Sequence, residues 1–206
     1  MAPWFSLHHY VLPEAQGAPS PTLDRALLGA AREFYERTRV WRPWLEITTV
    51  GAGREYALPV PADSEVVRLE QATLNGAPFG LLQADAQAVD LANDVGHDNG
   101  LAPVSSDLKR VIFAREQADG SLLRVQAALM PSETATGLAD PDFAQYVRAI
   151  AKGAAAELLS QSGVQWANPQ RAMQCREEFT SRIAAAAWRL HKGATSAVPR
   201  RRLRIF

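Results

Sequence analysis

The sequence contains one cysteine, Cys175, among its 206 residues. A single thiol cannot form a disulfide within the chain, and it cannot build a multi-thiolate metal site unless several subunits each contribute one. A fold held together by internal disulfides is therefore excluded. Because an unpaired cysteine commonly packs as a small apolar residue, we expect Cys175 to be a buried or half-buried helix residue.

Long apolar runs are also missing. No stretch approaches the roughly 18 uninterrupted apolar residues that cross a bilayer. The opening residues, MAPWFSLHHYVLPE, lack the basic region and the long apolar core of a secretion signal. With 47% hydrophobic and 21% charged residues, the composition predicts a soluble globular protein of cytosolic origin without a membrane partner.

Motifs for catalysis and metal binding are missing as well. Residues 51–53 lack the remaining glycine and the strand-to-helix context of a phosphate loop. Residues 94–100 offer oxygen ligands, but their glycines fall third and seventh and position twelve is Ser105, which does not fit a calcium loop. Four histidines occur without metal-ligand spacing: His8, His9, His97 and His191. We therefore predict no enzyme, no resident metal and no cofactor, while a catalytic site assembled from distant residues stays open as an alternative.

Charge is balanced over the whole chain but not along it. Lys plus Arg and Asp plus Glu both number 22. Residues 63–142 contain 13 acidic and 5 basic side chains, whereas residues 171–206 contain 9 basic and 2 acidic ones. The acidic middle and the basic end indicate two surfaces with different partners, although each block could equally be an ordinary solvated face.

The helical period appears first near the N-terminus. Ser20 as a cap, the proline after it and apolar residues at helical spacing predict a helix over about residues 21–39, which should stop before Pro43. The period returns after Asp140, which we expect to cap a second helix that ends near residue 162. Gly153 in the middle of this helix would let another backbone approach closely.

A third helix is predicted after Asn168, which is again a capping residue followed by a proline. A lysine and a glycine at residues 192–193 supply its basic last turn and its C-cap. The apolar positions expected on its buried side are Met173, Phe179, Ile183, Ala187 and Leu190.

Between the first two helices the apolar period changes from 3.6 to 2. The strand signals predict a hairpin of residues 44–50 and 54–58, a strand over 66–74 that turns at Asn75-Gly76, and a hairpin of residues 108–114 and 121–130. The polar and acidic residues 83–103 are expected to form a short helix and a loop.

These elements predict an α+β fold with an antiparallel helix bundle of three long helices, an inserted antiparallel β-sheet or sandwich, and an extended C-terminal tail. The helical bundle domain would comprise residues 1–43 and 131–193. The inserted β-rich domain would comprise residues 44–130, and the docking tail residues 194–206.

The tail combines basic and apolar residues. Its arginines first indicate nucleic acid, because each neutralised phosphate releases a counterion. The alternation of basic and apolar residues is instead typical of a strand that buries one face, and 13 extended residues could reach on the order of 45 Å onto another protein. The sequence therefore favours a docking peptide. The residues expected to bind are Arg200, Arg201, Arg202, Leu203, Arg204, Ile205 and Phe206.

Two tryptophans lie at the junction between the first helix and the first strand. Trp41 and Trp44 flank an arginine and a proline. Tryptophan beside arginine at the boundary of an element is favoured at protein interfaces, whereas packing in the core is the simpler interpretation. Both interpretations stay open for Trp41 and Trp44.

Nearly the whole chain, taken in order, carries motifs of one known family. The motifs are YVLPEAQGAPSPTLDRALLGAAREFYERTRVWR, REYALPVPADSEVVRLEQATLNGAPF, VQAALMPSETATGLAD, AKGAAAELL, WANPQ and the basic tail ending in Phe206. Together they resemble the head-to-tail adaptor (connector) family of short-tailed bacteriophages, a group related to tail tubular protein A. Residues 83–106 support the resemblance least, and the motifs are structural rather than catalytic.

The resemblance implies a ring of usually twelve copies beneath the portal, at the vertex through which double-stranded DNA leaves the capsid. The tail arginines would meet acidic portal surface while Leu203, Ile205 and Phe206 fill apolar pockets, and the β insert would project toward the tail (nozzle or tubular) protein. DNA would pass without sequence-specific binding. The protein would be made and assembled in the cytoplasm of the bacterial host and would reside at the head-tail junction of the virion.

A nucleic-acid-binding protein with a basic C-terminal arm remains the alternative. In that case affinity would fall steeply with salt, and the apolar residues of the tail would be immaterial.

Overall fold

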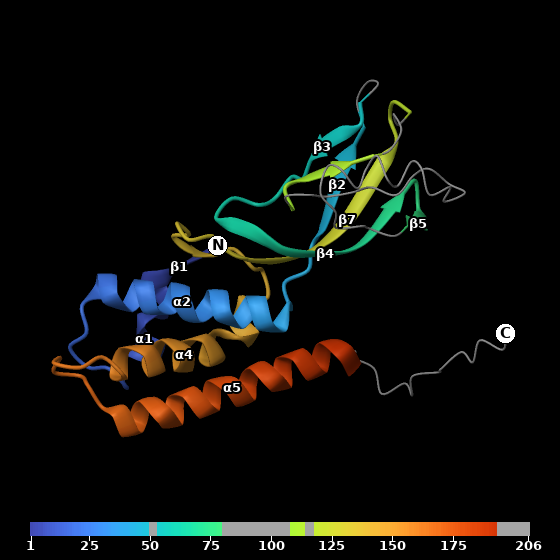
Figure 1. The fold of residues 1–206 in the computed structure, drawn as a ribbon. Helices are drawn as coiled ribbons and strands as arrows, with labels where there is room; N and C mark the ends of the chain where they lie inside the picture. The colour runs from blue at the N-terminus through green and yellow to red at the C-terminus, as the bar shows by residue number, and fades with distance from the viewer. Residues whose placement is uncertain (50–52, 80–107, 114–117, 193–206) are drawn as a thin grey trace, which may run out of the picture.

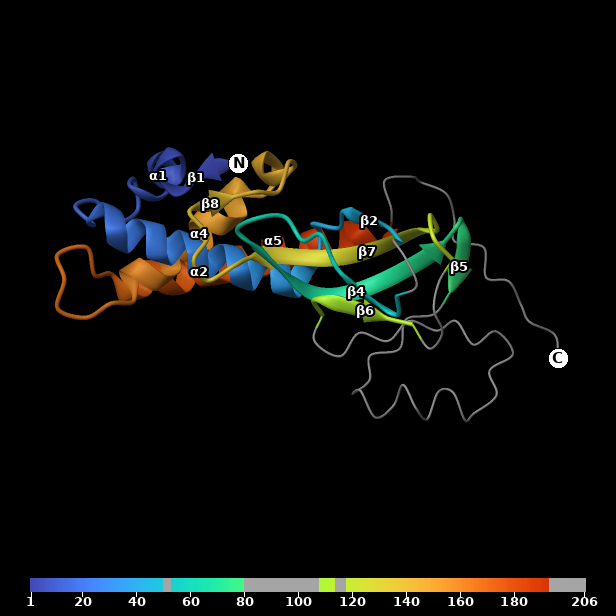
Figure 2. The same ribbon diagram turned by 90° about the horizontal axis from the view of Figure 1, so that it is seen from above.

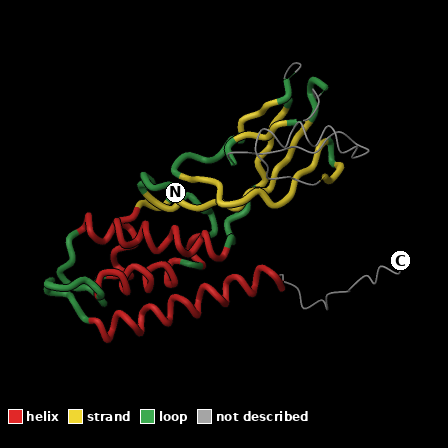
Figure 3. The backbone as a smooth tube through the Cα atoms, in the orientation of Figure 1, coloured by secondary structure: helices red, strands yellow, loops and turns green. Residues whose placement is uncertain are grey.

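The computed structural model describes residues 1–49, 53–79, 108–113 and 118–192 (Figure 1). Helices gather at one end and the main sheet extends from the other, as the tube coloured by secondary structure also shows (Figure 3). One continuous cluster of buried side chains includes Phe34 from the helices and Val125 from the sheet. The core therefore runs from the helices into the sheet.

Helix α2 (Ser20–Thr38) confirms the first predicted helix. Its cap residue is Pro19, so Ser20 is already the first helical residue and not the cap. The apolar positions at helical spacing are buried: Leu23, Leu27, Ala30 and Phe34. The helix ends at Arg39, whose φ of 53° is the left-handed conformation that closes many helices.

The expectation of an antiparallel bundle of three long helices was wrong. Helices α2 and α5 (Pro169–Lys192) are long, but α4 (Val147–Leu159) has 13 residues and follows a short 3-10 helix, η2 (Phe143–Gln145). A further short helix, α1 (His8–Val11), lies near the N-terminus. The described residues therefore form a mixed α and β structure, in which four α-helices accompany a multi-stranded antiparallel sheet.

The second helix begins later than expected because Asp140 turns inward. Its carboxylate accepts hydrogen bonds from the hydroxyl of Tyr35 (2.7 Å) and from the backbone N–H of Asp142 (2.9 Å), so it closes a turn and caps no helix. Burial raises the pKa of Asp140, and the hydrogen bond from Tyr35 opposes this rise. Burial also raises the pKa of Tyr35, to which the charge of Asp140 contributes.

Replacing Tyr35 with phenylalanine is expected to lower the free energy of unfolding at pH 7 by about 1 to 3 kcal/mol, because a buried carboxylate loses a hydrogen bond. The pKa of Asp140 should then rise further. A raised carboxyl pKa favours folding below its unfolded value and loses that stabilisation as the pH rises. The difference in the free energy of unfolding between the variant and the unmodified chain should therefore become smaller as the pH falls toward the ordinary pKa of aspartate. Urea unfolding at pH 7 and pH 4 would measure this change.

The matched control for this variant is Tyr146→Phe. The ring of Tyr146 packs against Phe34 with 5.2 Å between centroids, and its hydroxyl donates to no described residue. Its replacement should change the free energy of unfolding by no more than about 0.5 kcal/mol. An equal loss in both variants would show that the hydrogen bond to Asp140 is not the cause.

The three larger helices pack closely at Gly153. A Cβ added at this residue would lie 2.9 Å from the Cβ of Ala30 in α2 and 2.9 Å from the ring of Phe179 in α5. Such distances require a shift of the neighbouring side chains. Side chains of α2 and α5 therefore approach Gly153 closely, whereas the predicted approach of another backbone stays a prediction.

Helix α5 follows its predicted cap but faces the core in a different register. The side-chain oxygen of Asn168 accepts the backbone N–H of Arg171 at 3.1 Å, which confirms the cap. The buried side comprises Ala172, Cys175, Phe179, Ile183 and Ala186, so the prediction for Cys175 is also confirmed. Met173, expected on that side, is 67% exposed because the buried row begins at the residue before it.

The first 18 residues form structure that the sequence did not indicate. Strand β1 (Ala2–Pro3) pairs with β8 (Gly137–Leu138), and η1 (Trp4–Leu7) leads into α1. Trp4 is buried, and its Nε1–H donates to the carbonyl of Ala135 at 2.7 Å. A Cβ at Gly137 would collide with the carbonyl oxygen of Ala2, so the β1–β8 pairing requires glycine there.

The main sheet is antiparallel and has four strands in the order β2 (Trp44–Thr48), β7 (Leu122–Pro131), β4 (Ser64–Leu74) and β5 (Ala77–Phe79). Figure 2 shows β2, β7 and β4 following one another across the sheet. A separate antiparallel pair consists of β3 (Glu55–Ala57) and β6 (Arg110–Ile112).

One of the predicted hairpins is confirmed and two are wrong. Strands β4 and β5 join through Asn75 and Gly76, whose positive φ values of 50° and 83° suit a tight hairpin turn. Strand β2 pairs with β7 and not with β3, and β6 pairs with β3 and not with β7. The long-range pairing places Leu45 beside Val125, and both side chains are buried. Local turn signals do not reveal this burial of apolar surface. The short helix and loop predicted for residues 83–103 lie outside the described residues.

The two faces of the sheet differ. Leu45 and Val125 are buried, whereas Trp44, Glu46 and Arg124 are exposed on the outer face. Arg124 forms an ion pair with Glu46 at 2.8 Å, and its guanidinium carbon lies 5.6 Å from the ring centroid of Trp44. The outer face near β2 is therefore polar and aromatic, while the row behind it is apolar.

Candidate functional site

The tail residues predicted to bind a partner lie outside the described residues. They are Arg200, Arg201, Arg202, Leu203, Arg204, Ile205 and Phe206. The described chain ends at Lys192, the last residue of α5, so the structure fixes the point from which the tail departs. The docking role of the tail stays a prediction.

The two tryptophans at the helix-to-strand junction have different surroundings. Trp41 is 6% exposed and packs edge to face against Tyr35, with 6.0 Å between ring centroids. Trp44 is 40% exposed on β2. Trp41 therefore belongs to the core, and Trp44 alone of the two keeps substantial surface that a partner could cover.

An exposed apolar surface lies near the N-terminus. Phe5 in η1 is 70% exposed, and Tyr10 and Leu12 at α1 are also exposed. The ring of His9 stacks on Tyr10 with 4.0 Å between centroids. We call Phe5, Tyr10 and Leu12 the N-terminal apolar surface. The sequence did not reveal it, because exposure depends on which residues the segment packs against.

A second exposed surface, with a large apolar side chain near each end, lies along helix α5. Met173 and Trp188 are each 67% exposed near the two ends of the helix, and the small residues Thr180 and Ala184 are exposed between them. Spacings of seven, four and four residues place these four side chains on one side of the helix, which also carries the exposed Glu177. We call them the outer face of α5.

A groove of about 610 Å³ lies where α2, α4 and α5 meet. Small and apolar residues line much of it, and Met173 borders it. At its rim Arg176 binds both carboxylate oxygens of Glu33 at 2.6 Å, and burial raises the pKa of the nearby Glu157. The hydroxyl of Ser160 donates to the backbone carbonyl of Glu157, so this lining side chain is engaged within its own helix turn.

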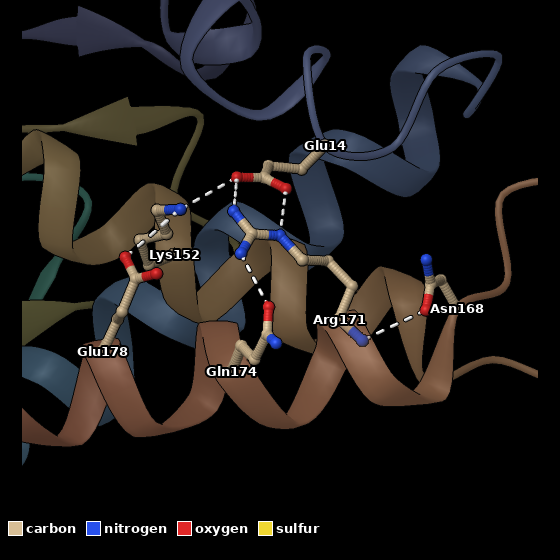
Figure 4. Close-up of polar contacts among 6 residues, drawn as sticks. All are labelled: Glu14, Lys152, Asn168, Arg171, Gln174 and Glu178. Atoms are coloured by element: carbon tan, nitrogen blue, oxygen red, sulfur yellow. Dashed lines mark hydrogen bonds and ion pairs between the residues drawn. The ribbon is translucent and has the colours of Figure 1, made fainter.

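A cluster of charged side chains joins the N-terminal segment to α4 and α5 (Figure 4). Arg171 donates two hydrogen bonds to Glu14, at 2.8 and 2.6 Å, and Lys152 contacts Glu14 at 2.8 Å and Glu178 at 3.2 Å. The hydrogen bond from Arg171, together with Lys152, lowers the pKa of Glu14 to about 2 despite partial burial. Each carboxylate has a cationic partner, so the cluster is suited to holding elements together rather than to proton transfer.

No group of three or more histidine, cysteine and acidic side chains arranged as metal ligands occurs among the described residues. His8 is engaged with the carboxylate of Asp24 at 2.6 Å. Within the part of the chain that the structure describes, no helix combines the length and apolar character needed to span a membrane.

Comparison of the sequence with protein-family models and with curated proteins finds no match. The resemblance to the phage adaptor family thus rests on the sequence motifs alone.

Proposed function

We propose that the protein is a structural head-to-tail adaptor of a bacteriophage virion. Copies of the chain would form a ring, with twelve members as the expected number, that joins the portal to the tail protein and continues the channel for double-stranded DNA. The structural observation that supports the proposal is the presence of two different surfaces with exposed large apolar side chains on one chain, the N-terminal apolar surface and the outer face of α5.

These two surfaces lie on different sides of the helical layer. Helix α4 packs against both α1 and α5, and Figure 1 shows it between them. Two different surfaces that cover each other in successive copies make a heterologous contact, which generates a ring when the rotation between copies closes. A symmetric dimer would need one self-complementary surface. The pair of surfaces therefore supports a ring better than a simple dimer.

The molecule is elongated, with the helices at one end and the sheet at the other, and this shape supports contacts with two different partners (Figure 1). The sheet extends away from the helices, so in a ring of helical layers it would be available to the tail protein (Figure 1). The tail departs from the end of α5, and its arginines and apolar residues would bind the portal. Contacts that are modest in one copy become strong when a ring repeats them.

Electron microscopy of the full chain mixed with the portal from the same genome tests the proposal. A ring added to one face of the portal is expected. Phe206→Ala should weaken docking as much as Arg204→Ala, because the proposed contact uses the apolar residues as well as the charges. The matched control is Leu122→Ala, which changes an exposed apolar residue outside the tail and should leave docking unchanged.

Two outcomes would contradict the proposal. Absence of any association between the full chain and the portal would remove the portal as partner. Salt-sensitive binding to DNA that depends on the arginines and ignores Phe206 would instead favour the nucleic-acid-binding alternative.

A further inference from the structure

Strand β2 forms an open edge of the main sheet. In the described part of the chain its one neighbour is β7, which pairs with it from Trp44 to Thr48. The residues just outside the strand, Pro43 and Thr49, hydrogen-bond to the β7 side through their backbones. Because such bonds involve alternate residues in an antiparallel pair, the backbone N–H and C=O groups of Trp44, Glu46 and Thr48 point away from β7.

The C-terminal tail begins on the same side of the molecule as this edge. In Figure 2 the last turns of α5 overlap β2, the strand at that side of the sheet, in projection, and in Figure 1 they lie well below it. Residues 193–206 follow the last described residue. Nine residues, 193–201, lie between the end of α5 and residues 202–206, and in extended form they span about 30 Å. This length sets how far residues 202–206 can lie from the end of α5.

The alternation of residues in the tail matches the alternation of residues in β2. Along β2, Leu45 and Ile47 lie in or against the core, whereas Trp44, Glu46 and Thr48 are exposed. In a strand formed by residues 202–206, Leu203 and Ile205 would share one face. The other face would carry Arg202, Arg204 and Phe206.

Side by side, these two strands would match on both faces. The apolar row of β2 would continue into Leu203 and Ile205. On the outer face Glu46, which pairs with Arg124 and is 54% exposed, would take Arg204 as a second partner, and the exposed part of the Trp44 ring, which Arg124 also contacts, would meet Phe206.

We propose that residues 202–206 add to β2 as an edge strand of the same chain when no partner is bound. Main-chain hydrogen bonds to the outward groups of Trp44, Glu46 and Thr48 hold the two strands together. The alternating side chains exclude a shift of one residue, because such a shift would turn the apolar side chains to the outer face. The added strand covers an edge that would otherwise invite pairing between chains. A partner that binds the tail must first displace it from β2.

This inference stands apart from the adaptor proposal, because it concerns one chain alone and its test contains no portal. Failure of the test would leave the adaptor proposal in place. Failure of the portal experiment would likewise leave the pairing of the tail with β2 in place.

Disulfide trapping in the full chain tests the proposal. Glu46 and Arg204 are the central residues of the two strands, so their Cβ atoms are near each other whether the strands run parallel or antiparallel. The double variant Glu46→Cys, Arg204→Cys should form an intrachain disulfide under mild oxidation, seen as a monomer of altered mobility on a denaturing gel. The matched control is Glu46→Cys, Leu203→Cys, in which the second cysteine lies on the opposite face and should cross-link far less. Cys175 is buried in α5 and stays in both variants.

Each other outcome would overturn the proposal. Equal cross-linking in both double variants would show contact without strand register. A disulfide-linked dimer would place the tail on a second copy, and no cross-link at all would place it elsewhere.

Hydrogen exchange gives a second measurement that needs no cysteine and no oxidant. The amides of Trp44, Glu46 and Thr48 should exchange at least about tenfold faster in the double variant Arg204→Pro, Ile205→Pro than in the unmodified chain, because one of the two prolines removes a pairing donor whether the added strand runs antiparallel or parallel to β2. The amides of Leu45 and Ile47, which face β7, should not change. Unchanged exchange at the three outward amides would overturn the proposal.

Discussion

Replacement of Phe34 by alanine is expected to lower the free energy of unfolding by about 3 to 5 kcal/mol. Phe34 in α2 is fully buried, and its ring lies 5.2 Å from that of Tyr146 and 6.5 Å from that of Phe179 in α5. The truncation would remove these ring contacts and leave a cavity where the helices meet, which the closely packed backbone near Gly153 cannot fill by moving inward.

Urea unfolding followed by circular dichroism would measure this loss. The matched control is Phe5→Ala, which removes the same atoms from a side chain that is 70% exposed. It should change the free energy of unfolding by no more than about 0.5 kcal/mol. Similar losses in both variants would contradict the position of Phe34 at the centre of the helical layer.

Replacement of Glu14 by glutamine is expected to lower the free energy of unfolding at pH 7 by about 1 to 3 kcal/mol, because the charge-assisted hydrogen bonds to Arg171 and Lys152 become ordinary ones or are lost. Glutamine keeps the shape of the side chain, so packing is little changed. The stabilisation by Glu14 should also depend on pH in a defined direction.

The pKa of Glu14 falls from 4.5 to about 2 on folding. A carboxylate whose pKa is lowered in the folded state stabilises the fold fully above its unfolded value and loses that stabilisation as the pH falls through the folded value. The stability of the unmodified chain should therefore approach that of Glu14→Gln between pH 4.5 and about pH 2. The control is Glu36→Gln, an exposed residue of α2. A constant difference between the Glu14 variant and the unmodified chain across this range would contradict the assignment.

Features decided within a few residues could be predicted from the sequence. The period and the end of α2, the cap at Asn168 and the turn at Asn75-Gly76 depend on neighbours along the chain, and each was identified from its local pattern. Close packing at Gly153 was also predicted, because a glycine inside an apolar stripe leaves room that the side chains of Ala30 and Phe179 occupy.

Features decided by distant residues could not be predicted in the same way. The late start of α4 depends on the hydrogen bond between Asp140 and Tyr35, which are 105 positions apart. The pairing of β2 with β7 depends on the apolar face that both share. The exposure of Met173 depends on how α5 is rotated against its neighbours, and a rotation by one position along the buried row is enough to turn this side chain outward.

The candidate site also combines features that the sequence indicates with features that only the packing of distant residues decides. The sequence drew attention to the tail and to Trp41 and Trp44, but only packing distinguishes the buried Trp41 from the exposed Trp44. The N-terminal apolar surface and the outer face of α5 carry no motif, since an apolar residue in a helix is recognised as surface only when its neighbours are placed.

The cluster around Glu14 has a consequence for the order in which the molecule is built during translation. Glu14 binds Arg171, 157 positions later, so this contact cannot form until most of the chain has left the ribosome. The strands of the main sheet all lie between residues 44 and 131 and are available earlier. The sheet can therefore pair while the N-terminal segment and α2 still lack α5, and the helical end is completed last.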